Sequence, residues 1–101
     1  MKLSIQNKNL IQRFFANKPV KRAYVFGSVA RNEATSDSDL DILVELDHSF
    51  PIGMKFFSYQ IELEELLKTR VELVSDEGIS QYIKPFVDQD KILIYERQSA
   101  R

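Results

Sequence analysis

Two aspartates, Asp39 and Asp41, stand two residues apart in a stretch where apolar and polar residues alternate. Residues i and i+2 of a strand face the same way, about 6.6 Å apart, so their carboxylates repel by about 2.5 kcal/mol at an effective dielectric constant of 20. In a cleft, a divalent cation relieves that repulsion. Oxygen ligands suit magnesium, which completes its shell with water and substrate phosphate. The pair therefore predicts a magnesium site, with a solvated strand face as the simpler alternative.

A group of residues suited to phosphate precedes this pair. Gly27 lets the backbone approach a phosphate closely, and the Ser28 hydroxyl and the N–H groups that follow can donate to it. Arg31 offers a forked, permanently charged donor. Two simpler interpretations stay open, with Ser28 as a helix N-cap and Arg31 paired on the surface with Glu33 or Asp37. Together the two groups predict a site for a nucleoside triphosphate with its metal.

The elements that must position these residues follow from hydrophobic spacing, which predicts the order helix, strand, strand, helix, strand, helix, strand. The expected helices cover residues 5–17, 54–68 and, more weakly, 80–89, and the expected strands cover 22–26, 38–46, 71–74 and 91–95. Pro85 is expected to divide the last helix or to begin its second half. This order predicts an α/β (α+β) fold, a small mixed sheet of about four strands covered by helices on at least one face.

The side chains outside the motif are given structural roles. His48 is expected on the surface of a loop, and most of the aromatic residues are expected in the core, although some could form an exposed patch for a partner. The aromatic residues in question are Phe14, Phe15, Phe56, Phe57, Tyr59 and Phe86.

Length and composition limit the class of protein. The 101 residues allow one domain, expected over residues 1–96 with a polar tail at 97–101. With 14 basic and 15 acidic residues the net charge is -1, which disfavours direct binding of nucleic acid by overall charge. The absence of cysteine excludes disulfides and thiolate ligands. Apolar runs are too short for a membrane span and no signal peptide is evident, so a cytoplasmic protein is expected.

The run GSVARNEATSDSDLDILVE resembles the nucleotidyltransferase superfamily of DNA polymerase β, whose signature is hydrophobic-Gly-Ser, a spacer, then Asp-hydrophobic-Asp. The Ala-Arg after Gly-Ser and the later Ser-Asp-x-Asp are similar to those of the minimal nucleotidyltransferases, or MNT proteins. These are single-domain antitoxins commonly encoded beside a HEPN-domain ribonuclease toxin. The resemblance is strong over residues 24–46 and weaker over 70–96.

The resemblance implies roles for particular residues. It makes Asp39 and Asp41 metal ligands, and it places Gly27, Ser28, Arg31 and Ser38 at the nucleotide. Glu72 takes the place of the third carboxylate, where aspartate is commoner in the family, and would help to deprotonate the attacking hydroxyl. An ion pair with Arg70, two residues away on the same strand face, is the alternative for Glu72.

The resemblance also implies the activity, which is transfer of AMP from ATP to a hydroxyl, expected to be that of a tyrosine, on a cognate HEPN toxin. Two Mg²⁺ ions are the implied cofactors, and a hetero-oligomer with the toxin is the implied assembly. Two alternatives stay open. One is an MNT-fold antitoxin that is catalytically silent and inhibits by binding alone. The other is a stand-alone nucleotidyltransferase acting on RNA ends or small molecules, which the near-neutral charge and the lack of a second domain disfavour.

Overall fold

The structure, a computed structural model, describes residues 3–98, so residues 99–101 of the expected tail lie outside the described residues. Its elements are α1 (Ile5–Ala16), β1 (Val20–Phe26), α2 (Gly27–Ala30), β2 (Leu40–Leu46), α3 (Lys55–Leu67), β3 (Val71–Ser75), α4 (Lys84–Asp90) and β4 (Ile92–Glu96). The seven expected elements are confirmed in type and order. One short helix, α2, follows β1 directly.

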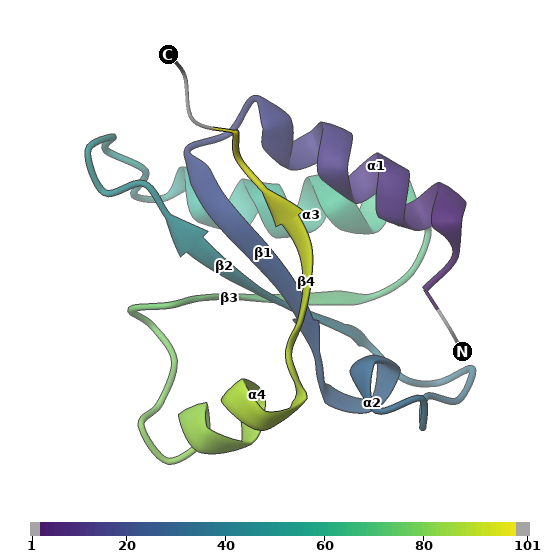
Figure 1. The fold of residues 1–101 in the computed structure, drawn as a ribbon. Coiled ribbons are helices and arrows are strands. Elements are labelled where there is room, and N and C mark those ends of the chain that lie inside the picture. Colours follow the sequence, from purple (N-terminus) through teal and green to yellow (C-terminus); the bar gives the residue numbers. More distant parts are fainter. Residues whose placement is uncertain (1–2, 99–101) are drawn as a thin grey trace.

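The strands form one mixed, four-stranded sheet in the order β3-β2-β1-β4. Strands β2 and β3 are parallel, and β1 is antiparallel to both β2 and β4. Helices α1 and α3 cover one face of the sheet, while α2 and α4 lie towards the same end of the sheet (Figure 1). The expected small mixed sheet with a helical layer is therefore confirmed. None of the helices within residues 3–98 combines the length and apolar character needed to cross a bilayer.

The core lies between the sheet and the α1–α3 layer. In β2 the alternation of the sequence becomes an alternation of faces, since Leu40, Ile42 and Val44 are buried beneath the helices while Asp41 and Glu45 are only half-buried on the other face. The helices contribute Ile11, Phe15, Tyr59, Leu63 and Leu67 to this core. Each fully buried side chain of this size stabilises the fold by about 1.5–3 kcal/mol.

The expectation that most of the aromatic residues lie in the core, with some exposed, is confirmed. Phe15 and Tyr59 are buried and Phe14 and Phe56 pack partly against the core, but Phe57 is 63% and Phe86 67% exposed. Helix α3 buries only the stripe that faces the sheet, and Phe57 lies outside that stripe. In α4 the buried side chain is Val87, and its neighbour Phe86 points to solvent.

The ends of the elements have local causes. The Ser4 side chain accepts a hydrogen bond of 3.0 Å from the Asn7 N–H and caps α1. Pro85 lies in the first turn of α4, where its missing N–H costs nothing, so it begins the second half of the expected segment. Strand β2 begins at Leu40 and not at Ser38, because residues 35–38 form a turn closed by the bond from Ser38 N–H to Thr35 O, 3.1 Å.

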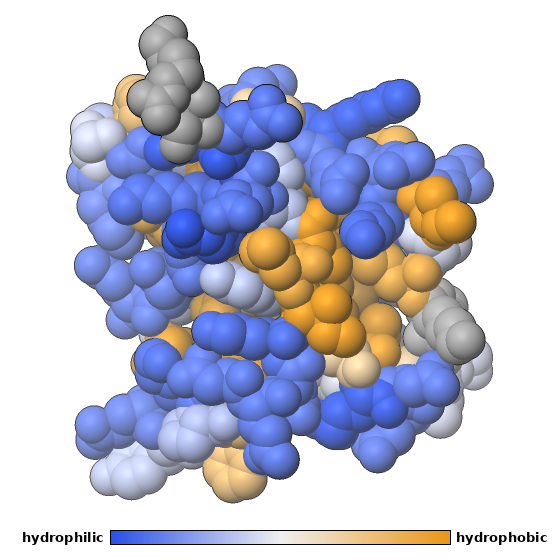
Figure 2. All heavy atoms as spheres, in the orientation of Figure 1, coloured by the Kyte–Doolittle hydropathy of each residue, from blue (hydrophilic) through white to orange (hydrophobic). Residues whose placement is uncertain are grey.

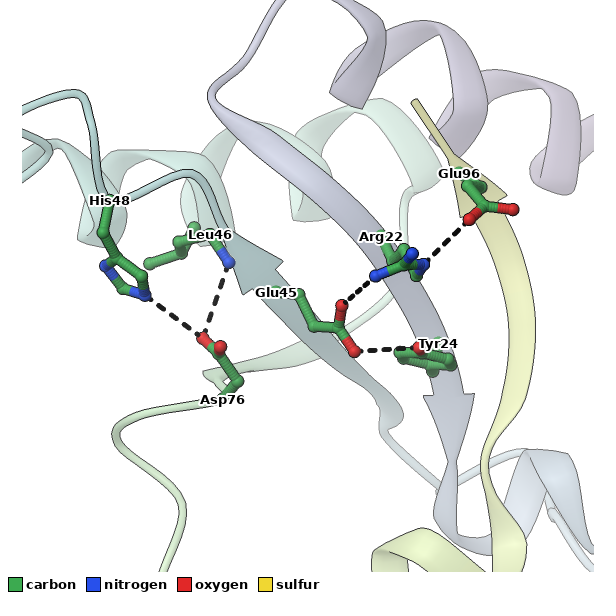
Figure 3. Close-up of polar contacts among 7 residues, drawn as sticks. All are labelled: Arg22, Tyr24, Glu45, Leu46, His48, Asp76 and Glu96. Atoms are coloured by element: carbon green, nitrogen blue, oxygen red, sulfur yellow. Dashed lines mark hydrogen bonds and ion pairs between the residues drawn. The ribbon is translucent and has the colours of Figure 1, made fainter. Parts of the chain in front are cut away.

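The sheet face opposite α1 and α3 carries a polar network (Figure 3). Arg22 of β1 bonds Glu45 of β2 and Glu96 of β4, each at 2.8 Å, and the Tyr24 hydroxyl donates to Glu45 at 2.9 Å. These bonds connect three strands of the sheet. His48 lies on the exposed loop after β2, 3.8 Å from Asp76, as expected for a surface residue.

A groove near the open edge of β4 is apolar (Figure 2). Its lining includes side chains from β1, α2 and β4, namely Val25, Val29, Ala30, Ile92 and Ile94. On the outer edge of β4, the Gln12 amide of α1 donates to the Ile94 carbonyl at 2.9 Å. That bond satisfies one of the backbone acceptors that an edge strand leaves open.

Candidate functional site

The register of three strands brings the motif residues together at one end of the sheet. Phe26, the last residue of β1, pairs with Asp41 of β2, so Gly27 follows directly beside that carboxylate. Asp41 in turn pairs with Glu72 of β3 in the parallel ladder. Paired residues on neighbouring strands point to the same face. Gly27, Asp41 and Glu72 therefore meet on the face that α1 and α3 leave open.

Gly27 is required here for two independent reasons. Its φ of +74° lies in the left-handed region, which side chains disfavour. In addition, a Cβ atom placed on Gly27 would overlap the Asp41 carboxylate. The sequence predicted close approach of the backbone to a phosphate, whereas the structure places one of the acidic side chains against this glycine.

The Asp41 carboxyl lies in an environment that disfavours its charge. Burial raises its pKa from 3.8 to about 6, helped by the charge of Glu72 and hydrogen bonding with it, and by the charge of Asp39. The positive charge of Arg31 acts in the opposite direction. A carboxylate that is half-buried beside other carboxylates is a favourable ligand for a cation, and an all-oxygen set suits magnesium. The residues present therefore fit the expected metal.

Asp39 lies just before β2 and forms an ion pair with the side chain of Arg70. The Arg70 Nε is 3.0 Å from the Asp39 carboxylate, and its Nη2 donates to the Asp37 carbonyl at 2.7 Å. The alternative in which Arg70 pairs with Glu72 is wrong, since Arg70 pairs with Asp39 instead. As the side chains lie, no three acidic or histidine side chains within residues 3–98 converge into a metal site.

Ser28 lies in α2, the short helix that begins at Gly27, and Arg31 follows as its C-cap residue. Ser28 is the second residue of α2 and Phe26 occupies the N-cap position, so the N-cap interpretation of Ser28 is wrong. Arg31 ends α2 and pairs with Glu33 at 3.0 Å and with Asp90 of α4 at 2.6 Å. Its pairing with Glu33 was one of the surface alternatives. The same guanidinium also acts on Asp41, which places its charge close to the acidic residues.

Ser38 lies in the turn before β2, next to Asp39. Its hydroxyl accepts a hydrogen bond of 2.9 Å from the Thr35 N–H. Its contact with nucleotide stays a prediction.

Two contacts of this region were not predicted from the sequence, those of Asp90 with Arg31 and of Arg70 with Asp39. Asp90, which holds Arg31, comes 59 residues later in the chain, and nothing in the local pattern connects the two. For Arg70 the sequence offers an ion pair with Glu72 only as an alternative to a metal-binding Glu72. The parallel pairing of β2 with β3 instead brings the Arg70 backbone beside Leu40, with a bond of 2.9 Å from Leu40 N–H to Arg70 O, and so beside Asp39.

Comparisons with known proteins agree with this geometry. The family model described as "Polymerase beta, Nucleotidyltransferase" matches residues 8–100. The protein adenylyltransferase MntA of Thermococcus cleftensis is 36% identical over 92 residues, which is 91% of this chain and 88% of that protein.

Two solved structures share the fold at low sequence identity. A toxin–antitoxin crystal structure with AMP-PNP superposes with a TM-score of 0.77 at 21% identity, covering 91% of this chain and 75% of the other. A complex of the tri-AMPylated Shewanella oneidensis HEPN toxin with its MNT antitoxin superposes with a TM-score of 0.70 at 20% identity, covering 92% and 72%.

Proposed function

We propose that this chain, which belongs to the polymerase β nucleotidyltransferase family, transfers AMP from ATP to a hydroxyl of a HEPN toxin and thereby neutralises it. The observation that carries the proposal is the meeting of Gly27, Asp41 and Glu72 at the ends of adjacent strands. The adenylyltransferase named above supports the reaction, and the AMPylated toxin complex supports the partner. In this proposal residues 1–96 form the catalytic domain, and the protein assembles with its toxin.

The donor nucleotide is bound around α2. The Ser28 hydroxyl makes no hydrogen bond to the rest of residues 3–98, so it is available to a phosphate oxygen. Arg31, aimed by Asp90 and Glu33, supplies a positive charge beside the triphosphate. Gly27 adds no side chain of its own at this corner, where the Asp41 carboxylate lies, and Ser38 contributes from the turn before β2.

Asp39, Asp41 and Glu72 would hold magnesium, with two ions as the family resemblance implies. When bound, the metal would neutralise the triphosphate and lower the pKa of the acceptor hydroxyl. The half-buried position of Asp41 and the proximity of Glu72 are the observations that support this assignment.

The reaction needs no covalent enzyme intermediate. The acceptor oxygen, which we propose belongs to a tyrosine, forms a bond to the α-phosphorus, and the bond from that phosphorus to the bridging oxygen breaks. Pyrophosphate leaves with the bonding electrons. In this proposal Glu72 takes the hydroxyl proton and releases it to solvent. The AMP group adds a negative charge to the toxin, which would disturb RNA binding by repulsion.

A second candidate is an antitoxin that inhibits by binding alone. One observation favours it, since Asp39 is paired with Arg70 and no three acidic or histidine side chains within residues 3–98 converge. Catalysis then requires these side chains to rearrange around a metal. The position of Glu72 beside Asp41 favours the enzyme, because the longer side chain still reaches the acidic cluster.

The deciding experiment incubates the protein with ATP, Mg²⁺ and its cognate HEPN toxin, and measures the intact mass of the toxin. The double variant Asp39→Asn/Asp41→Asn is the test. Glu62→Gln/Glu65→Gln is the matched control, because it removes two charges from the exposed side of α3.

We expect mass gains in whole AMP units with the wild type and the control, and none with the Asp39/Asp41 variant. Toxin inhibition without any mass gain would establish the binding antitoxin instead. AMP found on added RNA but not on the toxin would contradict both candidates.

A further inference from the structure

We infer that Arg70 is an internal counter-cation, which neutralises Asp39 while the site holds no metal and is displaced when a divalent cation binds. The inference rests on the metal site of the proposed function. It concerns a residue to which neither the motif nor the proposed reaction gives a role.

The contacts of Arg70 are directed at the metal-site segment. Its Nε lies 3.0 Å from the Asp39 carboxylate and its Nη2 donates to the Asp37 carbonyl at 2.7 Å. The guanidinium thus holds both the carboxylate and the backbone that carries it. A divalent cation would compete for the same carboxylate, since one Asp39 oxygen already has a positive partner.

The backbone fixes where this competition takes place. The Arg70 carbonyl accepts from the Leu40 N–H at 2.9 Å, so the main chain of Arg70 is fixed beside the start of β2 by the sheet itself. Only the side chain has to move when metal enters. Arg70 lies directly before β3 and Glu72 is the second residue of that strand, so the two side chains, two residues apart in extended chain, start from the face that carries Asp41.

The pair is also weak enough to be displaced. The side chains of Arg70 and Asp39 are 70% and 48% exposed, and ion pairs this exposed contribute little free energy because water competes for both charges. Arg31 differs in this respect. Its partner Asp90 is only 17% exposed and holds it at 2.6 Å, so Arg31 is the fixed cation of the site and Arg70 the displaceable one.

Manganese binding to the protein without nucleotide tests the inference. From the range measured for exposed ion pairs, Arg70→Gln should bind Mn²⁺ roughly two- to fivefold more tightly than the wild type. Arg70→Lys should stay close to the wild type, because it retains the charge. Arg97→Gln is the matched control, since Arg97 also pairs with an aspartate, Asp47 at 2.9 Å, roughly 25 Å away along β2.

A second measurement uses the wild-type protein. In ¹⁵N NMR spectra the Nε–H signal of Arg70 should shift as Mg²⁺ is added, and that of Arg97 should not. If Arg70→Gln has the Mn²⁺ affinity of the wild type, or if the Arg70 Nε–H signal does not shift when Mg²⁺ is added, the inference is overturned while the proposed metal site stands. If the wild type binds no divalent cation at all, both this inference and the proposed metal chemistry fail.

Discussion

The close approach of Gly27 to Asp41 makes Gly27→Ala an informative substitution. The residue has a φ of +74°, where an L side chain costs about 1–2 kcal/mol. The added Cβ would also overlap the Asp41 carboxylate, which must move away. Forced displacement in a packed site costs typically a further 1–3 kcal/mol. We therefore expect a total loss of about 2–5 kcal/mol in the free energy of unfolding.

Gly53→Ala separates the two contributions. Gly53 has a φ of +51°, and a Cβ atom there would have no neighbour within 4 Å. Its substitution should cost only the backbone contribution, about 1–2 kcal/mol. The excess cost at Gly27 then measures the displacement of Asp41.

Urea unfolding of a double-mutant cycle provides the assay. In an Asp41→Ala background the carboxylate is gone, and the new Cβ of Gly27→Ala meets the Asp41 Cβ at 3.5 Å, an ordinary contact. The cost of Gly27→Ala should then fall by about 1–3 kcal/mol. AMP transfer by the single Gly27→Ala variant should fall roughly 100-fold, since displacements near an ångström have effects of that size. Equal costs at Gly27 and Gly53, with no coupling to Asp41, would refute this reasoning.

Three further predictions follow from burial and charge. Asp41→Asn should raise stability at pH 7 without divalent metal by up to about 3 kcal/mol. In the wild type the pKa of Asp41 is about 6 in the folded state, above the ordinary value of 3.8. The protonated carboxyl therefore stabilises the fold at low pH, and this stabilisation is lost as pH rises through 6. Urea unfolding at pH 3 should then show no difference in stability between Asp41→Asn and the wild type. Burial, aided by Glu45, raises the pKa of Tyr24 to about 12. In a pH titration followed by tyrosinate absorbance, one step should therefore occur near pH 12, and Tyr24→Phe should remove it. The associated stability is present below pH 10 and is lost as pH rises through 12. Leu63→Ala, at a fully buried position, should cost about 2–5 kcal/mol in urea unfolding.

Much of the fold could be predicted because its signals are local. The alternation from Leu40 to Leu46 determines which side chains face the helices, and it places Asp41 and Glu45 on the opposite face. Helical spacing identified the buried stripe around Tyr59 and Leu63. It did not give the width of that stripe, because the exposed Phe57 has the same hydrophobic character as a core residue.

The partners within the site could not be predicted because they depend on register. That Arg70 meets Asp39 follows from the parallel pairing of β2 and β3, which aligns Leu40 with Val71. The contact between Arg31 and Asp90 requires α4 to lie beside α2, although the two residues are 59 positions apart in the sequence. The motif spacing predicts which residues form the candidate site, but only the three-dimensional pairing shows which charges neutralise one another.

The same register brings glutamate at position 72 beside Asp41. Neighbouring strands lie about 4.8 Å apart and Asp41 is paired with Glu72 across them, so the two side chains leave the sheet side by side on one face. Burial is the main cause of the raised pKa of Asp41, and the charge of Glu72 and hydrogen bonding with it raise that pKa further. Like charges side by side on adjacent strands destabilise a sheet, and here the cost is offset by the core beneath them. A purely structural domain would gain stability by losing this arrangement, so its presence argues for a site that binds a cation.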